Sequence, residues 1–95
     1  MKNERPIVEA LTTFTKNNPT SLHVPGHKSG LLSHLPNVLK ESLRYDLTEL
    51  PGLDDFHHPE EAIKEAELLL AKTYGADASF FLVNGSTVGN LAMIY

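Results

Sequence analysis

The sequence contains no cysteine among its 95 residues. A chain without cysteine has no disulfide framework and no thiolate chemistry, which fits a protein of the cytoplasm. Long apolar runs are absent too, since none approaches the ~18–20 residues that a membrane-spanning helix requires. The first five residues, MKNER, are not followed by an apolar segment, so no secretory signal is expected. These absences favour a soluble, cytoplasmic protein with no membrane partner.

Basic residues are few, with eight Lys and Arg against twelve Asp and Glu and a formal net charge of −4. No basic face or Lys/Arg cluster occurs, so nucleic acid is not an expected partner. The hydrophobic share of 41% and the charged share of 21% are ordinary for a globular protein and argue against disorder. The length allows one small domain and is too short for two.

Prolines, glycines and apolar spacing predict three helices in the first 75 residues. The first starts at Pro6, a residue suited to the first helical turn, and stops at Asn17-Asn18-Pro19. A second, short helix is expected from about Pro36 to Arg44. The third opens at Pro59 and ends at Gly75, the residue type that favours a left-handed C-cap. Its expected buried stripe is Ile63, Ala66, Leu70 and Tyr74.

The stretch after the third helix predicts a strand followed by a turn and another helix. Residues 79–83 are apolar on both faces, as in the interior of a parallel sheet covered by helices. A brief strand is also conceivable around Leu22 and Val24. This order of elements indicates an α/β architecture. Because one confident strand cannot build a sheet and the last helix lacks a stop signal, we expect the opening of a larger domain.

The turn Asn84-Gly85-Ser86-Thr87 has two interpretations that the residues alone leave open. Gly85 allows backbone to approach a ligand closely, and Ser86 and Thr87 add hydroxyl donors to the unpaired N–H groups of a helix N-terminus. This set suits a phosphate. The other interpretation is an ordinary turn in which Ser86 or Thr87 is the N-cap. A Walker loop is excluded, because the required Gly-Lys-Ser/Thr is missing.

The loop at residues 21–30 contains His23, His27 and Lys28. A zinc site on a helix is excluded for the two histidines, because Pro25-Gly26 lies between them, and loop or interface histidines are the preferred interpretation. Lys28 is expected at the solvated surface, with a contact to a carboxylate or carbonyl group as the alternative. No metal site is predicted.

A second loop, residues 45–58, is rich in carboxylates: Asp46, Glu49, Asp54 and Asp55. Their spacing lacks the glycine and terminal glutamate of an EF-hand, so calcium is not expected. Capping of turns is the leading interpretation, with pairing to His57 and His58 or a subunit contact as alternatives.

Four stretches occur in a characteristic order: HVPGHKSG at 23–30, DLTELPGLDDFHHP at 46–59, AIKEAELLLAKTYGAD at 62–77 and FFLVNGSTVGN at 80–90. Together they resemble the N-terminal part of the ornithine/lysine/arginine decarboxylases, which are pyridoxal-phosphate enzymes of the aminotransferase-like fold type I. The resemblance is closest to the shorter bacterial members, and it covers most of the chain from about residue 20.

The resemblance implies an α/β, fold type I major domain that begins with a helical segment followed by helix, strand, loop and helix. It implies that Gly85, Ser86 and Thr87 hold the phosphate of pyridoxal 5'-phosphate. The loop with His23, His27 and Lys28 would lie near the active site or a dimer contact. The intact enzyme would act on a basic amino acid, feed polyamine or diamine synthesis, and form a homodimer or higher homo-oligomer.

Under this resemblance, residues 1–45 form an N-terminal helical segment and residues 46–95 begin the cofactor-binding domain. The lysine that forms the Schiff base in the family lies in a Ser-x-His-Lys context that has no counterpart here, so no catalytic residue is assigned. His27-Lys28 belongs to a different site. The alternatives are a catalytically inert fragment with at most weak anion binding, or a stand-alone interaction module.

Overall fold

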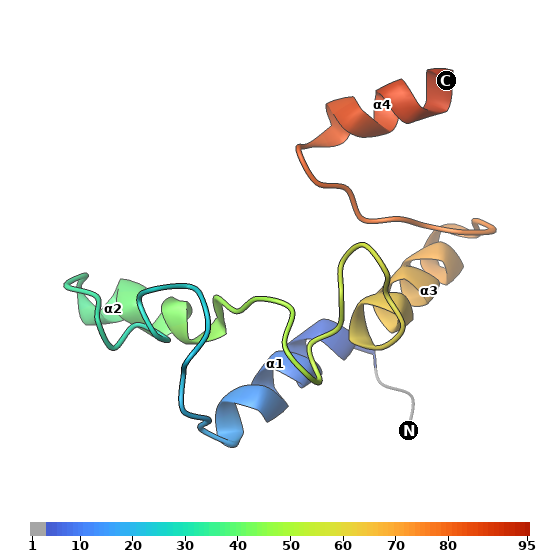
Figure 1. The fold of residues 1–95 in the computed structure, drawn as a ribbon. Coiled ribbons are helices and arrows are strands. Elements are labelled where there is room, and N and C mark those ends of the chain that lie inside the picture. Colours follow the sequence, from blue (N-terminus) through green and yellow to red (C-terminus); the bar gives the residue numbers. More distant parts are fainter. Residues whose placement is uncertain (1–3) are drawn as a thin grey trace.

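The computed structural model describes residues 4–95 and consists of helices joined by long loops (Figure 1). Within these residues the elements, in order, are α1 (Pro6–Lys16), α2 (Asn37–Lys40), the 3-10 helix η1 (Glu41–Tyr45), α3 (Ala62–Tyr74) and α4 (Ser86–Ile94). None of the helices in the described range is long and apolar enough to cross a membrane.

The first helix follows its prediction. Pro6 occupies the first helical turn, where a missing N–H costs nothing, and the helix ends at Lys16 with Asn17 as its C-cap. Asn18 then takes a left-handed conformation with φ of 44°. The proline and the asparagine pair therefore define both ends of α1 locally.

The second predicted helix is present but changes type. Only α2 is α-helical, and the chain continues as η1 up to Tyr45. The apolar side chains of α2 are largely uncovered, with Val38 81% and Leu39 53% exposed. This short segment packs against α1 through η1 rather than through α2.

The third helix differs from its prediction at its start and in its buried face. It begins at Ala62 and not at Pro59, because Glu61 has non-helical dihedral angles. The predicted end is confirmed: Gly75 is left-handed with φ of 66°, and the N–H of Ala76 bonds the carbonyl of Ala71 at 2.8 Å. Of the expected stripe, Tyr74 is exposed, and the buried residues of α3 are instead Glu67 and Ala71.

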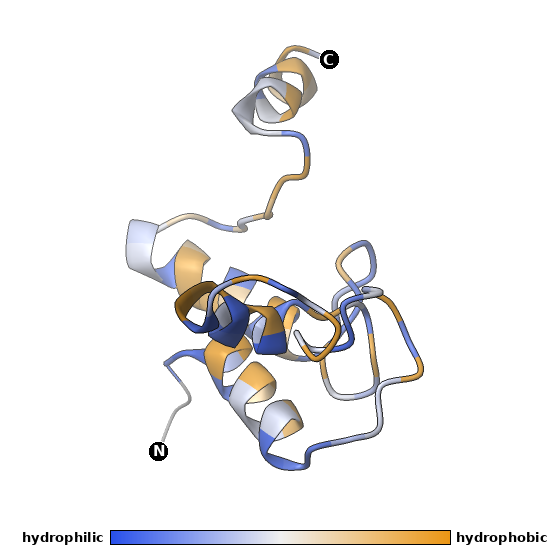
Figure 2. Cartoon of the chain, turned by 90° about the vertical axis from the view of Figure 1, so that its left-hand side faces the viewer, coloured by the Kyte–Doolittle hydropathy of each residue, from blue (hydrophilic) through white to orange (hydrophobic). Residues whose placement is uncertain are grey.

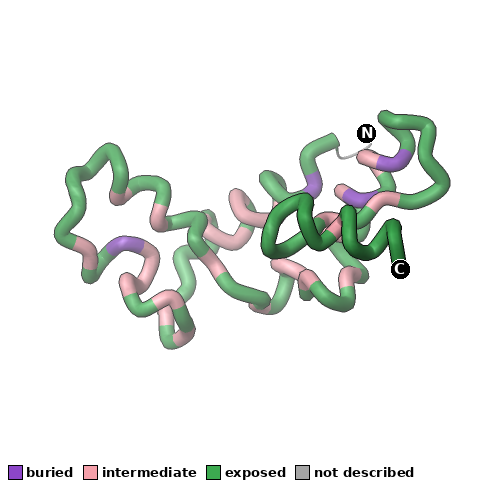
Figure 3. Tube along the Cα trace, turned by 90° about the horizontal axis from the view of Figure 1, so that it is seen from above, coloured by how far each residue is buried: buried purple, intermediate pink, exposed green. Residues whose placement is uncertain are grey.

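The core of the described residues is small. Helices α1 and α3 pack against each other, and near this contact Pro6 and Ala71 are buried. Figure 3 shows how few positions along the trace are buried. Polar contacts between loops and helices therefore have a large share in holding the described residues together.

The predicted strand at residues 79–83 is wrong for this structure, since residues 4–95 contain no strand, and neither Leu22 nor Val24 forms one. A strand is defined by hydrogen bonds to a neighbouring strand, and this one has no partner among the described residues. The segment runs extended and leads to α4, which contacts no other helix (Figure 1). The α/β architecture is thus not displayed by the described residues themselves.

We call residues 4–79 the body and residues 80–95 the arm. Figure 2 shows apolar positions along the segment that leads into α4 and on α4 itself. Phe80, Met93 and Ile94 are 72%, 79% and 81% exposed. Within the arm, Leu82 lies against Gly89, where an added Cβ would come within 2.7 Å of Leu82 Cδ1.

Candidate functional site

The turn before α4 has the backbone that its sequence predicts. Asn84 and Gly85 both have positive φ, of 63° and 78°, and α4 starts directly afterwards at Ser86. Gly85 is the N-cap, and no side chain caps the helix, so the interpretation of Ser86 or Thr87 as the N-cap is wrong. Gly85 combines its φ with ψ of −178°, a conformation essentially restricted to glycine.

The donors of this turn are free for a ligand. Within the described residues, no group accepts a hydrogen bond from the N–H groups or hydroxyls of Ser86 and Thr87, and both residues are exposed. The aligned peptide dipoles give this helix end partial positive charge. No residue from 84 to 90 is charged, so no carboxylate of the turn opposes an anion. The donor set therefore fits a phosphate group.

His27 fixes the second candidate site, the loop at residues 23–30. Its Nε2 lies 2.9 Å from Asp46 Oδ2, and its Nδ1 accepts the N–H of Gly30 at 3.1 Å. Because Nδ1 accepts, Nε2 carries the ring proton and donates to the carboxylate. Both ring nitrogens of His27 are thus hydrogen-bonded. Through Asp46, His27 connects its loop to the start of the carboxylate-rich loop at residues 45–58.

Lys28 and His23 form the other half of this loop. Lys28 Nζ donates to the carbonyl of His23 at 2.6 Å, so the alternative contact with a carbonyl is observed in place of the preferred solvated lysine. The ring of His23 stacks edge-on against Phe14 of α1, with centroids 6.3 Å apart. Lys28 and Ser29 both have positive φ, of 52° and 57°. The ammonium group is therefore held in place by the backbone and by a short hydrogen bond.

Gly30 closes the loop against α2 and η1. Its φ is +88°, and an added Cβ would lie 3.0 Å from the carbonyl oxygen of Lys40 and 3.3 Å from Leu43 Cβ. The backbone approach leaves no room for a side chain at this buried position. Gly30 therefore positions the residues of the loop that precede it.

The structure does not bring the two candidate sites together. The loop at residues 23–30 lies beside α2, whereas the turn at residues 84–87 lies at the start of α4, apart from the other helices (Figure 1). None of the cavities of about 670, 460, 640 and 310 Å³ among the described residues is lined by both. Each must therefore be considered as a separate binding element.

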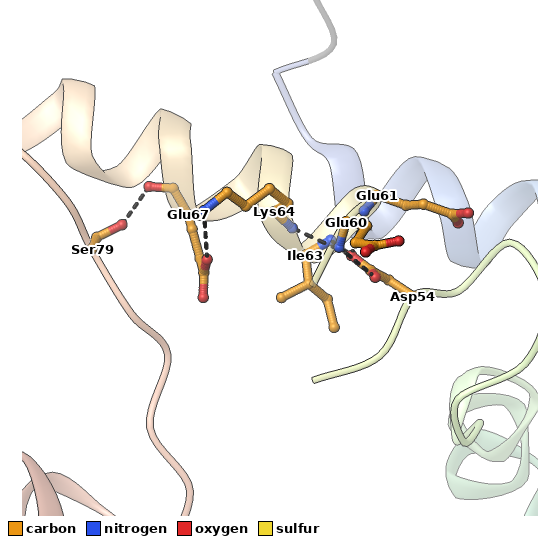
Figure 4. Close-up of polar contacts among 7 residues, drawn as sticks. All are labelled: Asp54, Glu60, Glu61, Ile63, Lys64, Glu67 and Ser79. Carbon is orange, nitrogen blue, oxygen red and sulfur yellow. Dashed lines mark hydrogen bonds and ion pairs between the residues drawn. The ribbon is translucent and has the colours of Figure 1, made fainter. Parts of the chain in front are cut away.

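The carboxylates of residues 45–58 mostly cap turns, which confirms the leading interpretation. Asp54 accepts the N–H groups of Asp55 and Glu60 on one oxygen, at 2.8 and 3.0 Å. Its other oxygen accepts those of Glu61, Ile63 and Lys64 at 2.9 to 3.3 Å (Figure 4). These are donors of the entry and first turn of α3. A remote aspartate therefore caps this helix, which spacing in the sequence did not reveal.

The environment of Asp54 determines its charge. Burial alone would raise the pKa of this carboxyl, but the N–H groups of Glu60, Asp55, Glu61 and Ile63 outweigh it and lower the pKa to about 2. Asp54 itself has φ of 70°, a conformation that aspartate tolerates better than most residues. The carboxylate form of Asp54 is therefore the form that caps the start of α3.

The remaining polar groups of this region pair locally. His58 Nε2 lies 3.0 Å from Glu60 Oε1, and Asp55 accepts the N–H of His57 at 3.0 Å. Ser79 donates to the carbonyl of Glu67 and so ties the end of the body to α3 (Figure 4). No group of three or more His, Cys, Asp or Glu side chains within residues 4–95 is arranged to hold a metal ion.

Comparison with known proteins gives a consistent result. The family model described as "Orn/Lys/Arg decarboxylase, major domain" matches residues 5–95. The chain is 50% identical over 91 residues to "Uncharacterized protein YaaO" of Bacillus subtilis (strain 168), covering 94% of this chain and 19% of that protein. It is 38% identical over 96 residues to an arginine decarboxylase of Bacillus cereus, covering 96% of this chain and 20% of that protein.

A more distant relative is named for a different substrate. Lysine decarboxylase LdcA of Pseudomonas aeruginosa is 31% identical over 97 residues, covering 90% of this chain and 12% of that protein. The chain thus spans a fifth or less of the length of these curated relatives. No solved structure matches it.

Proposed function

This chain belongs to the Orn/Lys/Arg decarboxylase family, and from that premise we propose that it is the N-terminal part of a decarboxylase of a basic amino acid. The observation that carries the proposal is the family match over residues 5–95. Relatives named for arginine and for lysine support a basic substrate, with ornithine as the third candidate. The product would be a diamine or polyamine precursor, formed in the cytoplasm.

The cofactor of the proposed enzyme is pyridoxal 5'-phosphate, which when bound supplies an electron sink for the carbanion left by departing carbon dioxide. The part proposed for this chain is to bind and orient. The N–H groups and hydroxyls of Ser86 and Thr87, with Gly85 giving close backbone access, would hold the phosphate at the start of α4. Their unpaired donors and their exposure support this assignment.

We extend the proposal to the architecture of the intact enzyme. Residues 1–45 would form an N-terminal helical segment, and residues 46–95 would begin an α/β, fold type I cofactor domain. Residues 79–83 would pair there with strands contributed by the rest of the polypeptide. The apolar character of Phe80, Leu82 and Val83, which are all exposed here, supports this pairing.

The loop with His23, His27 and Lys28 is proposed to lie near the active site or a contact between subunits of a homo-oligomer. The defined conformation of this loop supports the proposal. Both ring nitrogens of His27 are hydrogen-bonded, and Lys28 has a positive φ. No catalytic step is assigned to residues 1–95, because the sequence contains no counterpart of the family's Schiff-base lysine.

The phosphate assignment is tested with Ser86→Ala combined with Thr87→Ala in the full polypeptide. Because each lost hydrogen bond to a charged group is worth roughly 1.5–3 kcal/mol, cofactor affinity should fall by about tenfold or more. An absorbance titration with pyridoxal phosphate measures it. The matched control, Thr12→Ala with Ser42→Ala, removes two hydroxyls that bond their own backbone and should leave affinity unchanged. Equal affinity of both double variants would remove Ser86 and Thr87 from the cofactor site.

The activity itself is tested by incubating the full, cofactor-loaded polypeptide with arginine, lysine and ornithine in turn. Release of carbon dioxide with the corresponding amine from one of them is the expected result. Failure with all three would overturn the proposed reaction while leaving cofactor binding at residues 85–87 open to the first test.

A further inference from the structure

A cavity of about 460 Å³ lies between the C-terminal end of α1 and the loop at residues 18–31. Phe14 and Leu31 supply apolar wall, and Ser21, His23, Lys28 and Arg44 are among its polar lining residues. It shares no residue with the turn at residues 84–87. Two of its lining residues, His23 and Lys28, belong to the loop described above as the second candidate site.

The charge of this cavity has one sign. Lys28 and Arg44 are its charged lining residues, and no Asp or Glu lines it. The carboxylate near Arg44 is Glu41, 3.7 Å away in an exposed pair that is worth little and lies outside the lining. A second cavity on α1 has the opposite character, since Glu9, Glu60, Glu61 and Glu65 line it without any cation. The positive lining is therefore specific to the first cavity.

Two residues that line the cavity, Lys28 and Ser21, have hydrogen-bonding capacity that the described residues do not use. Lys28 Nζ uses one of its three N–H groups on the carbonyl of His23, which leaves two. His23 Nδ1 lies 2.8 Å from the carbonyl of Val24 and so donates to it. Ser21 Oγ is buried and has no hydrogen-bond partner. A buried hydroxyl without a partner is unfavourable, so a rotation of the Ser21 side chain that brought its proton to an acceptor in the cavity would be favourable.

The backbone around Lys28 is arranged for a fixed cation. Lys28 and Ser29 both have left-handed φ, which costs energy for residues other than glycine and occurs preferentially at binding sites. His27 and Gly30 brace the same turn against Asp46 and Lys40. The Lys28 side chain therefore loses little conformational entropy when a ligand binds.

We propose that this cavity is an oxyanion-binding site that takes the carboxylate or phosphate group of a small molecule. Lys28 and Arg44 supply the charge, Ser21 Oγ donates a hydrogen bond, and Phe14 with Leu31 contacts the apolar part of the ligand. The site is independent of the phosphate turn at residues 85–87. It stands whether or not the polypeptide decarboxylates a basic amino acid.

The experiment titrates the full polypeptide with sodium phosphate and, separately, sodium acetate at constant ionic strength, followed by calorimetry and by the NMR signals of the His23 ring. Saturable binding that shifts the His23 signals is the expected result. A stronger response to phosphate assigns a phosphate-bearing ligand, and a stronger response to acetate assigns a carboxylate. Absence of saturable binding of either anion would overturn the proposal.

Single substitutions test whether the anion binds in this cavity. Lys28→Met and Arg44→Gln should each weaken it about tenfold or more, and Ser21→Ala should weaken it less. Lys16→Met, which removes a lysine outside the lining, should leave it unchanged. If Lys28→Met fails to fold, the exposed Arg44→Gln decides alone. Equal affinity of Arg44→Gln and Lys16→Met would overturn the site.

Ser86→Ala with Thr87→Ala separates this inference from the proposed function. That double variant should lose cofactor affinity and keep the anion response of the His23 ring. Loss of the His23 response in it would show that the anion binds at the turn, and it would overturn the second site without affecting the first.

Discussion

The body and the arm contain similar apolar side chains but differ in their polar contacts. In the body, hydrogen bonds join residues distant in sequence, such as His27 to Asp46 and Ser79 to Glu67. In the arm, no side chain of residues 80–95 makes a hydrogen bond or an ion pair. Exposed apolar residues occur in both, including Val38 in the body and Ile94 in the arm.

This difference shows that polar contacts, more than apolar burial, stabilise the conformation of the body. Burial contributes about 25 cal/mol per Å² of apolar surface, and few side chains here are buried far enough to use it. The body compensates with backbone groups satisfied by Asp54, His27 and Lys28. The arm has no equivalent, so its conformation depends on what covers its apolar side chains.

Gly30→Ala should have the largest effect, because it disrupts the body where backbone meets backbone. The new Cβ would meet the carbonyl oxygen of Lys40 at 3.0 Å, at a φ of +88°. We expect a loss of about 1–3 kcal/mol, measured as faster amide hydrogen exchange in residues 27–45. Gly26→Ala, whose added Cβ meets nothing within 4 Å, is the matched control. Similar exchange in both variants would contradict the bracing role of Gly30.

Asp54→Asn should cause the second-largest loss of stability. Asparagine tolerates the same positive φ but retains a single accepting oxygen, so two or three N–H groups at the start of α3 lose their acceptor. The expected cost is about 1–2 kcal/mol, seen as faster exchange in residues 61–66 with the arm unaffected. Asp77→Asn changes an exposed aspartate after α3 and should have no such effect. Exchange that rises equally in the arm would contradict the separation of the two regions.

The same aspartate predicts a pH dependence. Its pKa falls from the ordinary 3.8 to about 2 in the folded chain, so ionised Asp54 stabilises the fold fully above pH 3.8. That contribution is lost as pH drops from 3.8 towards 2. Amide exchange of α3 followed through this range should show it, and Asp54→Asn should flatten the profile. If amide exchange in Asp54→Asn depends on pH as steeply as in the wild type, the acid sensitivity arises from other carboxyl groups.

Gly89→Ala should have the smallest effect and the opposite sign. Alanine favours a helix over glycine by up to about 1 kcal/mol. The new Cβ would meet the end of the half-exposed Leu82 side chain, which can rotate away. Circular dichroism should therefore show equal or slightly higher helix content. Gly85→Ala, with φ of +78°, should lower it, and the reverse order would contradict this geometry of the arm.

Features determined by neighbouring residues were predictable from the sequence. Pro6, Asn17 and Gly75 placed helix ends because each acts within its own turn, whereas the start of α4 was predicted only to within the turn at residues 84–87. The turn itself, with positive φ at Asn84 and Gly85, was predictable from its own residues.

Features that depend on contacts through space were not predictable. The start of α3 depends on Asp54, which belongs to a loop several residues earlier, and Pro59 gave a misleading signal. The strand at residues 79–83 requires a partner strand that residues 4–95 do not contain. Ser21 and Arg44 line one cavity although neither stood out in the sequence.

The short sequence range of the Asp54 contacts has a consequence for synthesis. A polypeptide leaves the ribosome N-terminus first, and contacts between residues 54 and 64 span ten positions, so they can form early. The arm emerges later with its apolar side chains uncovered. We therefore expect residues 80–95 to be the stretch that a chaperone recognises on the nascent polypeptide, while the segment before them is already structured.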